Sequence, residues 1–179
     1  MPWNEATISR AGRLAVLAQH CVRVCTQSIV VVSLRSGAVV GTIPGGELPT
    51  WSADGQTLYF VKQVPGRTLY LKDSSGNNLG FQTQTSQIWR ANGDGSHPLK
   101  LLAEDAFGFG TLNLTPDGSA IIFSRVDNDW GIWQHRLAGN RFTPAIETQY
   151  GPKVQIQRFD SGHLPVTIVA NAGRPAVEP

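Results

Sequence analysis

Few residues in this sequence could do chemistry, and the most suggestive group is the stretch HCVRVC at His20–Cys25. In an extended strand Cys21 and Cys25 would lie about 13 Å apart at the usual rise per residue, too far for a disulfide. In a tight loop the two thiols could be bridged. A structural metal site needs about four ligands, and no second Cys/His pair completes them. We therefore expect free thiols, with a loop disulfide or a metal site as alternatives.

The other candidate groups do not form a recognisable catalytic or metal-binding constellation. NGDG at Asn92–Gly95 is similar to part of a calcium loop, but the glutamate that closes such a loop is missing, so a hairpin turn is predicted. Glu104 and Asp105 are neighbours, and adjacency alone does not make a general acid–base pair. The histidines fall at unrelated repeat positions: His20, His97, His135 and His163. We predict no enzyme activity, no cofactor and no metal for this chain.

Composition argues against two classes of function. The 179 residues suit one domain, and the net charge of +2 comes from scattered Lys and Arg, so no basic patch for nucleic acid is expected. No apolar run approaches the roughly 20 residues of a membrane span, and the first residues lack the pattern of a signal peptide. With 19 Gly and 11 Pro, we expect a soluble chain with many turns.

A repeated turn indicates which elements would position any site. WSADGQTLYF at Trp51–Phe60 returns as LTPDGSAIIF at Leu114–Phe123, and ISRAGRLAVL at Ile8–Leu17 is a weaker copy. A second motif recurs as VVVSLRSG, IWRANGDG and IWQHRLAG, and a degenerate first motif follows in RFDSGHLPVTIV. The repeat unit is about 43 residues long, written three times and then begun a fourth time.

Each repeat unit is predicted to contain four strands. Alternating apolar positions with β-branched or aromatic residues flank the turns, and Asp-Gly suits a tight hairpin because Gly accepts a positive φ. Four-stranded units of this length are typical of β-propeller blades. We therefore predict an all-β chain of about three and a half blades, each of four antiparallel strands. The expected bounds are 1–46, 47–105, 106–148 and an incomplete 149–170, followed by a flexible tail over 171–179.

The first motif also carries a family resemblance. LTPDGSAIIFS resembles the repeat of TolB-type β-propellers in full, whereas WSADGQTLYFV departs from it at Ala53 and ISRAGRLAVLA at Arg10 and Ala11. The resemblance covers about Ile8–Val169 and implies blade architecture. Members of this family include the periplasmic TolB protein, which binds other proteins, propeller domains that gate prolyl-oligopeptidase-like enzymes, and oligogalacturonide lyases. It allows a periplasmic or extracellular location, but it implies no catalytic residues, because no G-x-S-x-G nucleophile elbow is present.

The predicted number of blades is unusual, because most propellers have four to eight. An open stack of blades would leave the flanks of its first and last blades exposed. We therefore expect either part of a longer propeller or self-association into a larger ring. Two copies would leave two half-blades, so such a ring would not close cleanly.

One insertion marks the candidate binding site. The second unit is longer than the first and third by about 15–19 residues, and the additional residues fall within 62–87. Loops on a rigid scaffold commonly carry function, and RTLYLKD could be one strand of an additional hairpin turned at SSGNN. The candidate contact residues there are Arg67, Tyr70, Lys72 and Phe81. The alternative is a solvated decoration of the blade.

The tryptophans divide into packing and contact positions. Trp89 and Trp133 occupy equivalent repeat positions, and Trp51 aligns with apolar residues, so we expect all three to pack inside the protein. Trp130 precedes a predicted third strand, in a loop, and is the tryptophan predicted to be exposed for binding.

Polar groups are scarce where a propeller enzyme would need them. The predicted channel-facing first strands read EATIS, LPTWS and LNLT, which favours binding over catalysis. We predict a non-enzymatic TolB-like propeller that acts as a protein-interaction platform through its top-face loops, especially residues 62–87. The alternative is the propeller domain of an enzyme whose catalytic part lies outside this chain. That enzyme would be a prolyl-oligopeptidase-like peptidase, or a carbohydrate-active or lyase protein built on the same scaffold.

Overall fold

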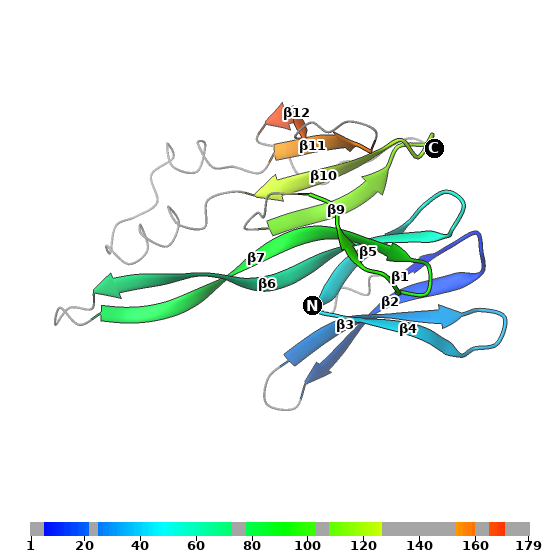
Figure 1. Ribbon diagram of the computed structural model, residues 1–179, viewed down its shortest axis with the longest axis horizontal. Helices are drawn as coiled ribbons and strands as arrows, with labels where there is room; N and C mark the ends of the chain where they lie inside the picture. The colour runs from blue at the N-terminus through cyan, green and yellow to red at the C-terminus, as the bar shows by residue number, and fades with distance from the viewer. Residues whose placement is uncertain are drawn as a thin grey trace.

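The computed structural model describes residues 6–21, 25–72, 78–102, 108–126, 153–159 and 165–170. All regular secondary structure in these segments is β-strand, and the strands form three four-stranded antiparallel sheets (Figure 1). The prediction of an all-β chain with four antiparallel strands per unit is confirmed. Within the described segments no helix is long and apolar enough to cross a membrane.

The first sheet is a simple meander in which consecutive strands are neighbours. It contains β1 (Ala6–Ile8), β2 (Arg13–Cys21), β3 (Cys25–Ser33) and β4 (Val39–Pro44). β2 and β3 pair along their whole length, and the final pair joins Cys21 to Cys25. The backbone therefore places these two residues opposite each other on a hairpin, which is the tight-loop arrangement and not a single extended strand.

The second sheet has central strands that are much longer than its outer strands. It contains β5 (Gly46–Trp51), β6 (Thr57–Lys72), β7 (Asn78–Asn92) and β8 (Leu99–Lys100). β6 has 16 residues and β7 has 15, whereas β5 has 6 and β8 has 2. The ladder between β6 and β7 continues to the pair Lys72–Asn78, so the predicted additional hairpin is confirmed in the backbone.

The third sheet differs from the expected distribution of strands. It contains β9 (Gly108–Leu114), β10 (Ala120–Val126), β11 (Lys153–Arg158) and β12 (Val166–Ala170). The repeat spacing predicts a fourth unit over 149–170, but the structure pairs both strands of that segment into the third sheet. The third strand expected over 132–139 lies outside the described residues.

Backbone pairing explains this reassignment. β9 occupies one edge of β10, and β11 occupies the other in a regular ladder from Ala120–Arg158 to Arg125–Lys153. Hydrogen bonding between antiparallel strands depends on their register and not on the length of chain that connects them. The entropy of closing a loop also rises only slowly with its length, so a distant segment can complete a sheet.

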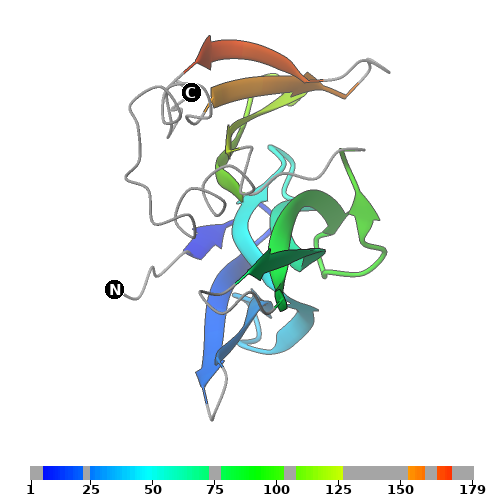
Figure 2. The same ribbon diagram turned by 90° about the vertical axis from the view of Figure 1, so that its left-hand side faces the viewer.

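The three sheets stack face to face, and the second lies between the other two (Figures 1 and 2). One buried cluster joins the first sheet to the second. Its members are Ala15, Ile29, Val31, Ile43, Trp51, Leu58, Phe60 and Ala91, and Trp89 packs against it. The structure thus confirms the packing roles predicted for Trp51 and Trp89, whereas Trp133 lies outside the described residues.

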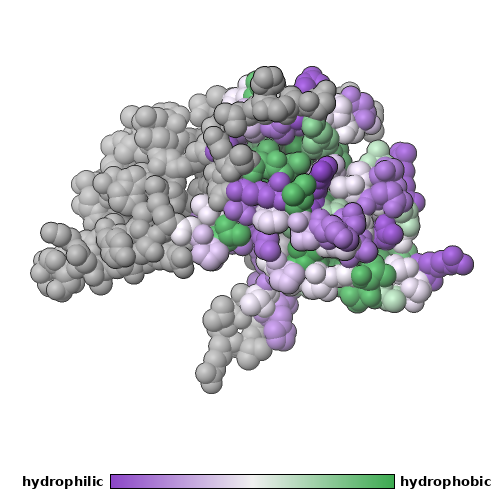
Figure 3. All heavy atoms as spheres, in the orientation of Figure 1, coloured by the Kyte–Doolittle hydropathy of each residue, from purple (hydrophilic) through white to green (hydrophobic). Residues whose placement is uncertain are grey.

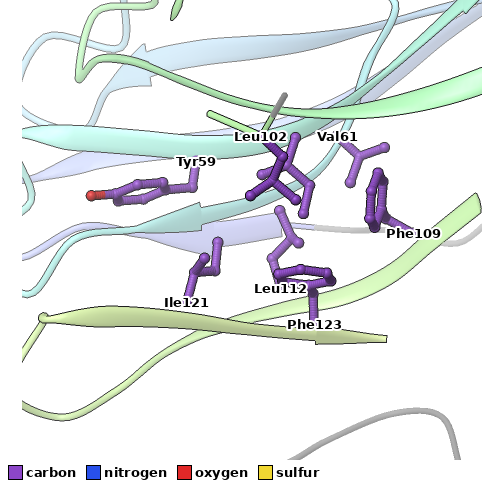
Figure 4. Packing of buried hydrophobic residues seen from close by; sticks show 8 residues of the cluster. Tyr59, Val61, Leu102, Phe109, Leu112, Ile121 and Phe123 are labelled. Carbon is purple, nitrogen blue, oxygen red and sulfur yellow. The ribbon is translucent and has the colours of Figure 1, made fainter. Parts of the chain in front are cut away.

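A second buried cluster joins the second sheet to the third (Figure 4). Its members are Tyr59, Val61, Ile88, Leu102, Phe109, Leu112, Ile121 and Phe123. Along β6, Leu58 and Phe60 face the first sheet while Tyr59 and Val61 face the third. This strand is therefore apolar at consecutive positions, as expected where both faces of a sheet are buried.

The Asp-Gly turns hold the first two strands of the second and third sheets together in the same way. Gly55 has a φ of +71° and its N–H donates to the carbonyl of Ser52, while the Asp54 carboxylate accepts from the N–H of Gln56 at 3.0 Å. The segment Thr115–Ala120 repeats these hydrogen bonds. The tight turns predicted from the repeated motif are confirmed.

Candidate functional site

The candidate site is the part of β6 and β7 that extends beyond the rest of the second sheet, residues 62–87, which we call the arm. The ladder with β5 ends at the pair Gly46–Lys62, and β8 pairs with β7 only at Arg90 and Trp89. Beyond these points β6 and β7 continue as a two-stranded ribbon that projects from the body of the molecule (Figure 1). Among the described strands, β6 and β7 therefore pair only with each other along the arm.

The ladder places the four contact residues predicted on the arm. Tyr70 and Lys72 lie two residues apart on β6, so they share one face of the ribbon. Phe81 of β7 is opposite Leu69, which puts it on the other face. Arg67 lies within the register shift between Pro65 and Thr68. In the backbone ladder Tyr70 pairs with Gly80, Lys72 with Asn78 and Phe81 with Leu69.

Several other predicted positions lie outside the described residues. They are Trp130, His135, His163, Glu104 and Asp105. His97 is described: its Nδ1 lies 3.1 Å from the side-chain amide of Asn92 and 3.0 Å from the hydroxyl of Ser96. These contacts belong to the turn between β7 and β8, which confirms the hairpin predicted at NGDG.

The root of the arm holds a cation–aromatic pair that the sequence patterns did not indicate. The ammonium of Lys62 lies 5.4 Å from the centre of the Trp89 ring, whose Nε1 donates to Oε1 of Gln87 at 3.0 Å. Lys62 and Gln87 are direct ladder partners, so the register of β6 and β7 creates this group. The sequence predicts that Lys62 and Trp89 lie on two strands joined by the insertion. It does not predict the register of those strands, and the register makes the two residues neighbours.

The carboxylate of Glu47 on β5 forms hydrogen bonds at the base of the arm, next to Lys62 and Gln63. Glu47 accepts hydrogen bonds from the side-chain amides of Gln27 at 3.0 Å and Gln63 at 3.2 Å. The backbone repeats this link, since Gly45 N–H donates to the Gln27 carbonyl and Gln63 N–H donates to the Gly45 carbonyl. These bonds tie the first sheet, the start of the second and the base of the arm into one unit. The arm therefore begins from a rigid base.

The acidic groups with perturbed pKa values serve the turns. Hydrogen bonds from Thr115 and Ser119 lower the pKa of Asp117 to about 2. The pKa of Asp54 is lowered in the same way, mainly by a hydrogen bond from the Ser52 hydroxyl and less by one from the Gln56 N–H.

Burial raises the pKa of Tyr59, which stacks on Phe159 with ring centres 5.4 Å apart. Within the described part of the chain, no three His, Cys, Asp or Glu side chains come close enough to hold a metal ion.

The described surface is mixed in character. In Figure 3 polar residues cover much of the face turned to the viewer, and hydrophobic residues gather over the third sheet in its upper part. Exposed large hydrophobic side chains occur on all three sheets: Ile8, Leu34, Val39, Val40, Leu99 and Val166. Single exposed hydrophobic residues of this kind are ordinary on protein surfaces.

Comparison with known proteins identifies the fold. No protein-family model and no curated protein matches the sequence. Among solved structures, the β-propeller domain of the Trilobed protease from Pyrococcus furiosus, which has an open velcro topology, aligns at 13% identity with a TM-score of 0.54. TolB from Acinetobacter baumannii aligns at 14% with a TM-score of 0.51, and an acylaminoacyl peptidase from Pyrococcus horikoshii at 13% with 0.55.

These similarities cover most of this chain and a smaller part of each propeller. The alignments include 91%, 89% and 86% of this chain, but only 41%, 31% and 22% of the three solved chains, in the same order. The chain therefore has the fold of part of a β-propeller, which confirms at the level of fold the resemblance to TolB-type repeats. The three similar chains include propellers of peptidases and the TolB propeller, so the fold is shared across these classes.

Proposed function

We propose that this propeller is a non-enzymatic protein-interaction platform whose top-face loops, and above all the arm at residues 62–87, contact another protein. The observation that carries the proposal is the two-stranded ribbon beyond Lys62 and Gln87. There Thr68–Lys72 and Asn78–Gln82 pair with each other and with no other described strand. Each of them therefore has an outer edge to which an extended segment of a partner can add.

The side-chain types along the ribbon support the same role. Tyr, Arg and Phe are residue types that contribute strongly at protein interfaces, because they combine large contact area with directional polar or π interactions. Tyr70 and Lys72 are two residues apart on β6, so alternation along a strand would put an aromatic and a cationic residue on one face of the arm. The bonds of Glu47 at the root limit the entropy lost when a partner binds.

Shortening the arm tests the proposal directly. Gln63 and Ser86 are ladder partners, so residues 64–85 can be replaced by an Asn-Gly turn that keeps the bonds of Glu47 and the rest of the sheet. We expect the shortened protein to keep its circular dichroism spectrum and to lose the proteins that the full chain retains from extracts of its native source. Retention of the same proteins in the same amounts by the shortened chain would refute a role for the arm.

Point variants define the contact face. The double variant Tyr70→Ala, Lys72→Ala alters one face of the ribbon and Phe81→Ala alters the other. A partner that docks on the first face should lose at least about tenfold in affinity with the double variant, which corresponds to about 1.4 kcal/mol. Leu99→Ala, at an exposed position on β8 away from the arm, is the matched control.

The second candidate is the propeller domain of an enzyme. It is favoured by the similarity to the protease propeller domain and to acylaminoacyl peptidase, each of which aligns with at least 86% of this chain. An immunoblot of native extracts with an antibody to this chain distinguishes the two. A band near the 19.4 kDa of the chain supports the platform, whereas a longer product that co-purifies with peptidase or lyase activity supports the enzyme domain.

A further inference from the structure

The hairpin of β2 and β3 ends at the two cysteines of the sequence. Its ladder runs from Arg13–Ser33 to Cys21–Cys25 without a register shift, so the cysteines are direct ladder partners. Residues opposite each other in an antiparallel pair have Cα atoms roughly 4.5–5.5 Å apart, and a disulfide needs roughly 4.4–6.8 Å. The hairpin therefore meets the distance requirement that a single extended strand would fail.

The hydrogen bonds show which kind of pair the cysteines form. Hydrogen-bonded and non-hydrogen-bonded pairs alternate along an antiparallel ladder. The N–H of Leu34 donates to the carbonyl of Gly12 at 2.9 Å, one step beyond the first pair of the ladder. Cys21 lies an odd number of residues from Gly12, so Cys21–Cys25 is a non-hydrogen-bonded pair. In such pairs the Cα atoms are nearest, at roughly 4.5 Å, and the side chains are closer together.

A second hydrogen bond gives the same assignment. The carbonyl of Gln27 accepts from the N–H of Gly45, which follows β4, so this carbonyl points away from β2. Gln27 therefore belongs to a non-hydrogen-bonded pair with its ladder partner Gln19. Pairs two steps apart are of the same kind, so Cys21–Cys25 is of this kind as well.

The cysteines close the part of the hairpin that extends beyond the flanking strands. β1 pairs with β2 no further than Val16, and β4 pairs with β3 no nearer the tip than Ser28. Figure 2 shows this hairpin, in blue, reaching the lower end of the molecule. At the tip β2 and β3 pair, among the described strands, only with each other, and His20 and Thr26 are exposed. A two-stranded ribbon is marginally stable by itself, so a covalent link between its strands would stabilise the tip.

We propose that Cys21 and Cys25 form a cross-strand disulfide, and that the tip of this hairpin is a thiol–disulfide switch. The co-reactant is a small disulfide such as oxidised glutathione. The thiolate of one cysteine attacks a sulfur of this molecule and releases one glutathione thiolate, which takes up the proton that the cysteine had lost. The thiolate of the other cysteine then attacks the protein sulfur of the mixed disulfide and releases the second glutathione in the same way. The protein dithiol is thereby oxidised, and the oxidised glutathione is reduced to its thiol form.

The switch is connected to the base of the arm. Gln27, two residues from Cys25, donates from its side-chain amide to Glu47 at 3.0 Å, and Glu47 also accepts from Gln63 at 3.2 Å. A disulfide that limits opening of the tip would also hold Gln27 in place against Glu47. Oxidation would therefore make one end of this group of hydrogen bonds more rigid, whether or not the arm binds a partner.

A comparison of the folded and the unfolded chain in mixtures of reduced and oxidised glutathione tests the disulfide. We expect its equilibrium constant of formation to be at least about tenfold higher in the folded chain than in concentrated urea, because the ladder brings the cysteines together before they react. Trypsin cleaves after Arg23, so mass spectrometry without reductant should find the peptides 14–23 and 24–35 joined. An equal constant in urea, or chains that carry a glutathione on each cysteine, would overturn the proposal.

A matched variant separates the effect of the register from closeness in the sequence. The double variant Cys25→Ser, Thr26→Cys keeps two thiols but moves the second by one residue, and alternation along β3 puts that residue on the opposite face of the hairpin. The higher constant of the folded chain should then disappear. If it persists, the register does not bring the thiols together and the proposal fails.

Amide hydrogen exchange measures the effect on the tip. His20 and Thr26 form the hydrogen-bonded pair next to the cysteines, and oxidation should slow exchange of their N–H groups at least about tenfold by limiting local opening. Exchange at the buried Leu58 should not change, and the double variant Cys21→Ser, Cys25→Ser should not respond to the oxidant. Unchanged exchange at the tip of the oxidised protein would contradict a switch. The arm is unaltered in these variants, so failure of the switch leaves the proposed function unaffected.

Discussion

At the scale of single residues, the repeated turn shows how an exposed Asp can be structurally important. The carboxylate of Asp117 accepts hydrogen bonds from the hydroxyl of Thr115 at 2.5 Å, the N–H of Ser119 at 3.1 Å and the hydroxyl of Ser119 at 2.8 Å. All three bonds favour the ionised carboxylate. The hydroxyl of Thr115 also accepts from the N–H of Ala120, so the turn is tied to β10.

We expect the pKa of Asp117 to be about 2 in the folded protein, against an ordinary value of 3.8. Because the pKa is lower in the folded state, the carboxylate stabilises the fold above about pH 4, and this contribution is lost as the pH falls through 2. Asp117→Asn removes the titrating group, so its free energy of unfolding should fall less steeply over this range. Denaturation at several pH values measures the free energy of unfolding of both proteins. Equal slopes of this free energy against pH below about pH 4 would contradict the prediction.

Gly55 and Gly118 provide a matched pair for backbone strain. Their φ values are +71° and +70°, but a Cβ on Gly55 would lie 2.8 Å from the backbone nitrogen of Ala11, whereas one on Gly118 would have nothing within 4 Å. Gly118→Ala should therefore destabilise by roughly 1–2 kcal/mol from the left-handed conformation alone. Gly55→Ala should destabilise further, by about 1–3 kcal/mol, because the turns of the first two sheets must separate. Equal losses in urea denaturation would argue against close packing of those turns.

At the scale of elements, the second sheet combines a buried blade with a projecting ribbon in the same two strands. Leu58, Phe60 and Val61 are completely buried between neighbouring sheets. Ten residues further along β6, Thr68–Lys72 pairs only with β7 among the described strands. An isolated two-stranded hairpin is marginally stable in water, so the stability of the ladder should decrease from the blade toward the tip of the arm.

Amide hydrogen exchange measures this gradient. We expect the amides of Leu58 and Phe60 to exchange only on global unfolding, and those of Leu69 and Leu71 to exchange at least about a hundredfold faster through local opening. A bound partner that adds a strand to the arm should slow exchange at Leu69 and Leu71 and leave Leu58 unchanged. Equal protection along the whole of β6 in the free protein would show that another element already supports the arm.

At the scale of the whole molecule, two buried clusters join the three described sheets into one stack. The second sheet contributes to both clusters, because neighbouring residues of β6 face opposite sides: Leu58 and Phe60 pack toward the first sheet, and Tyr59 and Val61 toward the third.

The sequence by itself determined the local features of this protein. The Asp-Gly turns, the strands on either side of them, the core positions of Trp51 and Trp89 and the additional hairpin of the second unit were all predicted correctly. The turns depend on interactions between residues near each other in the chain, such as the bonds of Asp54 to Ser52 and Gln56, and the core positions follow from the alternation of apolar residues along each strand. Propensity and alternation encode such interactions directly.

Only the tertiary structure decided which strands share a sheet and which residues become neighbours across it. The assignment of β11 and β12 to the third sheet depended on the free edge of β10, and the pairing of Lys62 with Trp89 depended on the register of the arm. Likewise the row of apolar residues Ile8, Leu14, Val32 and Val39 across the first sheet became visible only when its four strands were aligned. An apolar alternating strand can pair with any compatible edge, so its partner is chosen by long-range packing and not by its own residues.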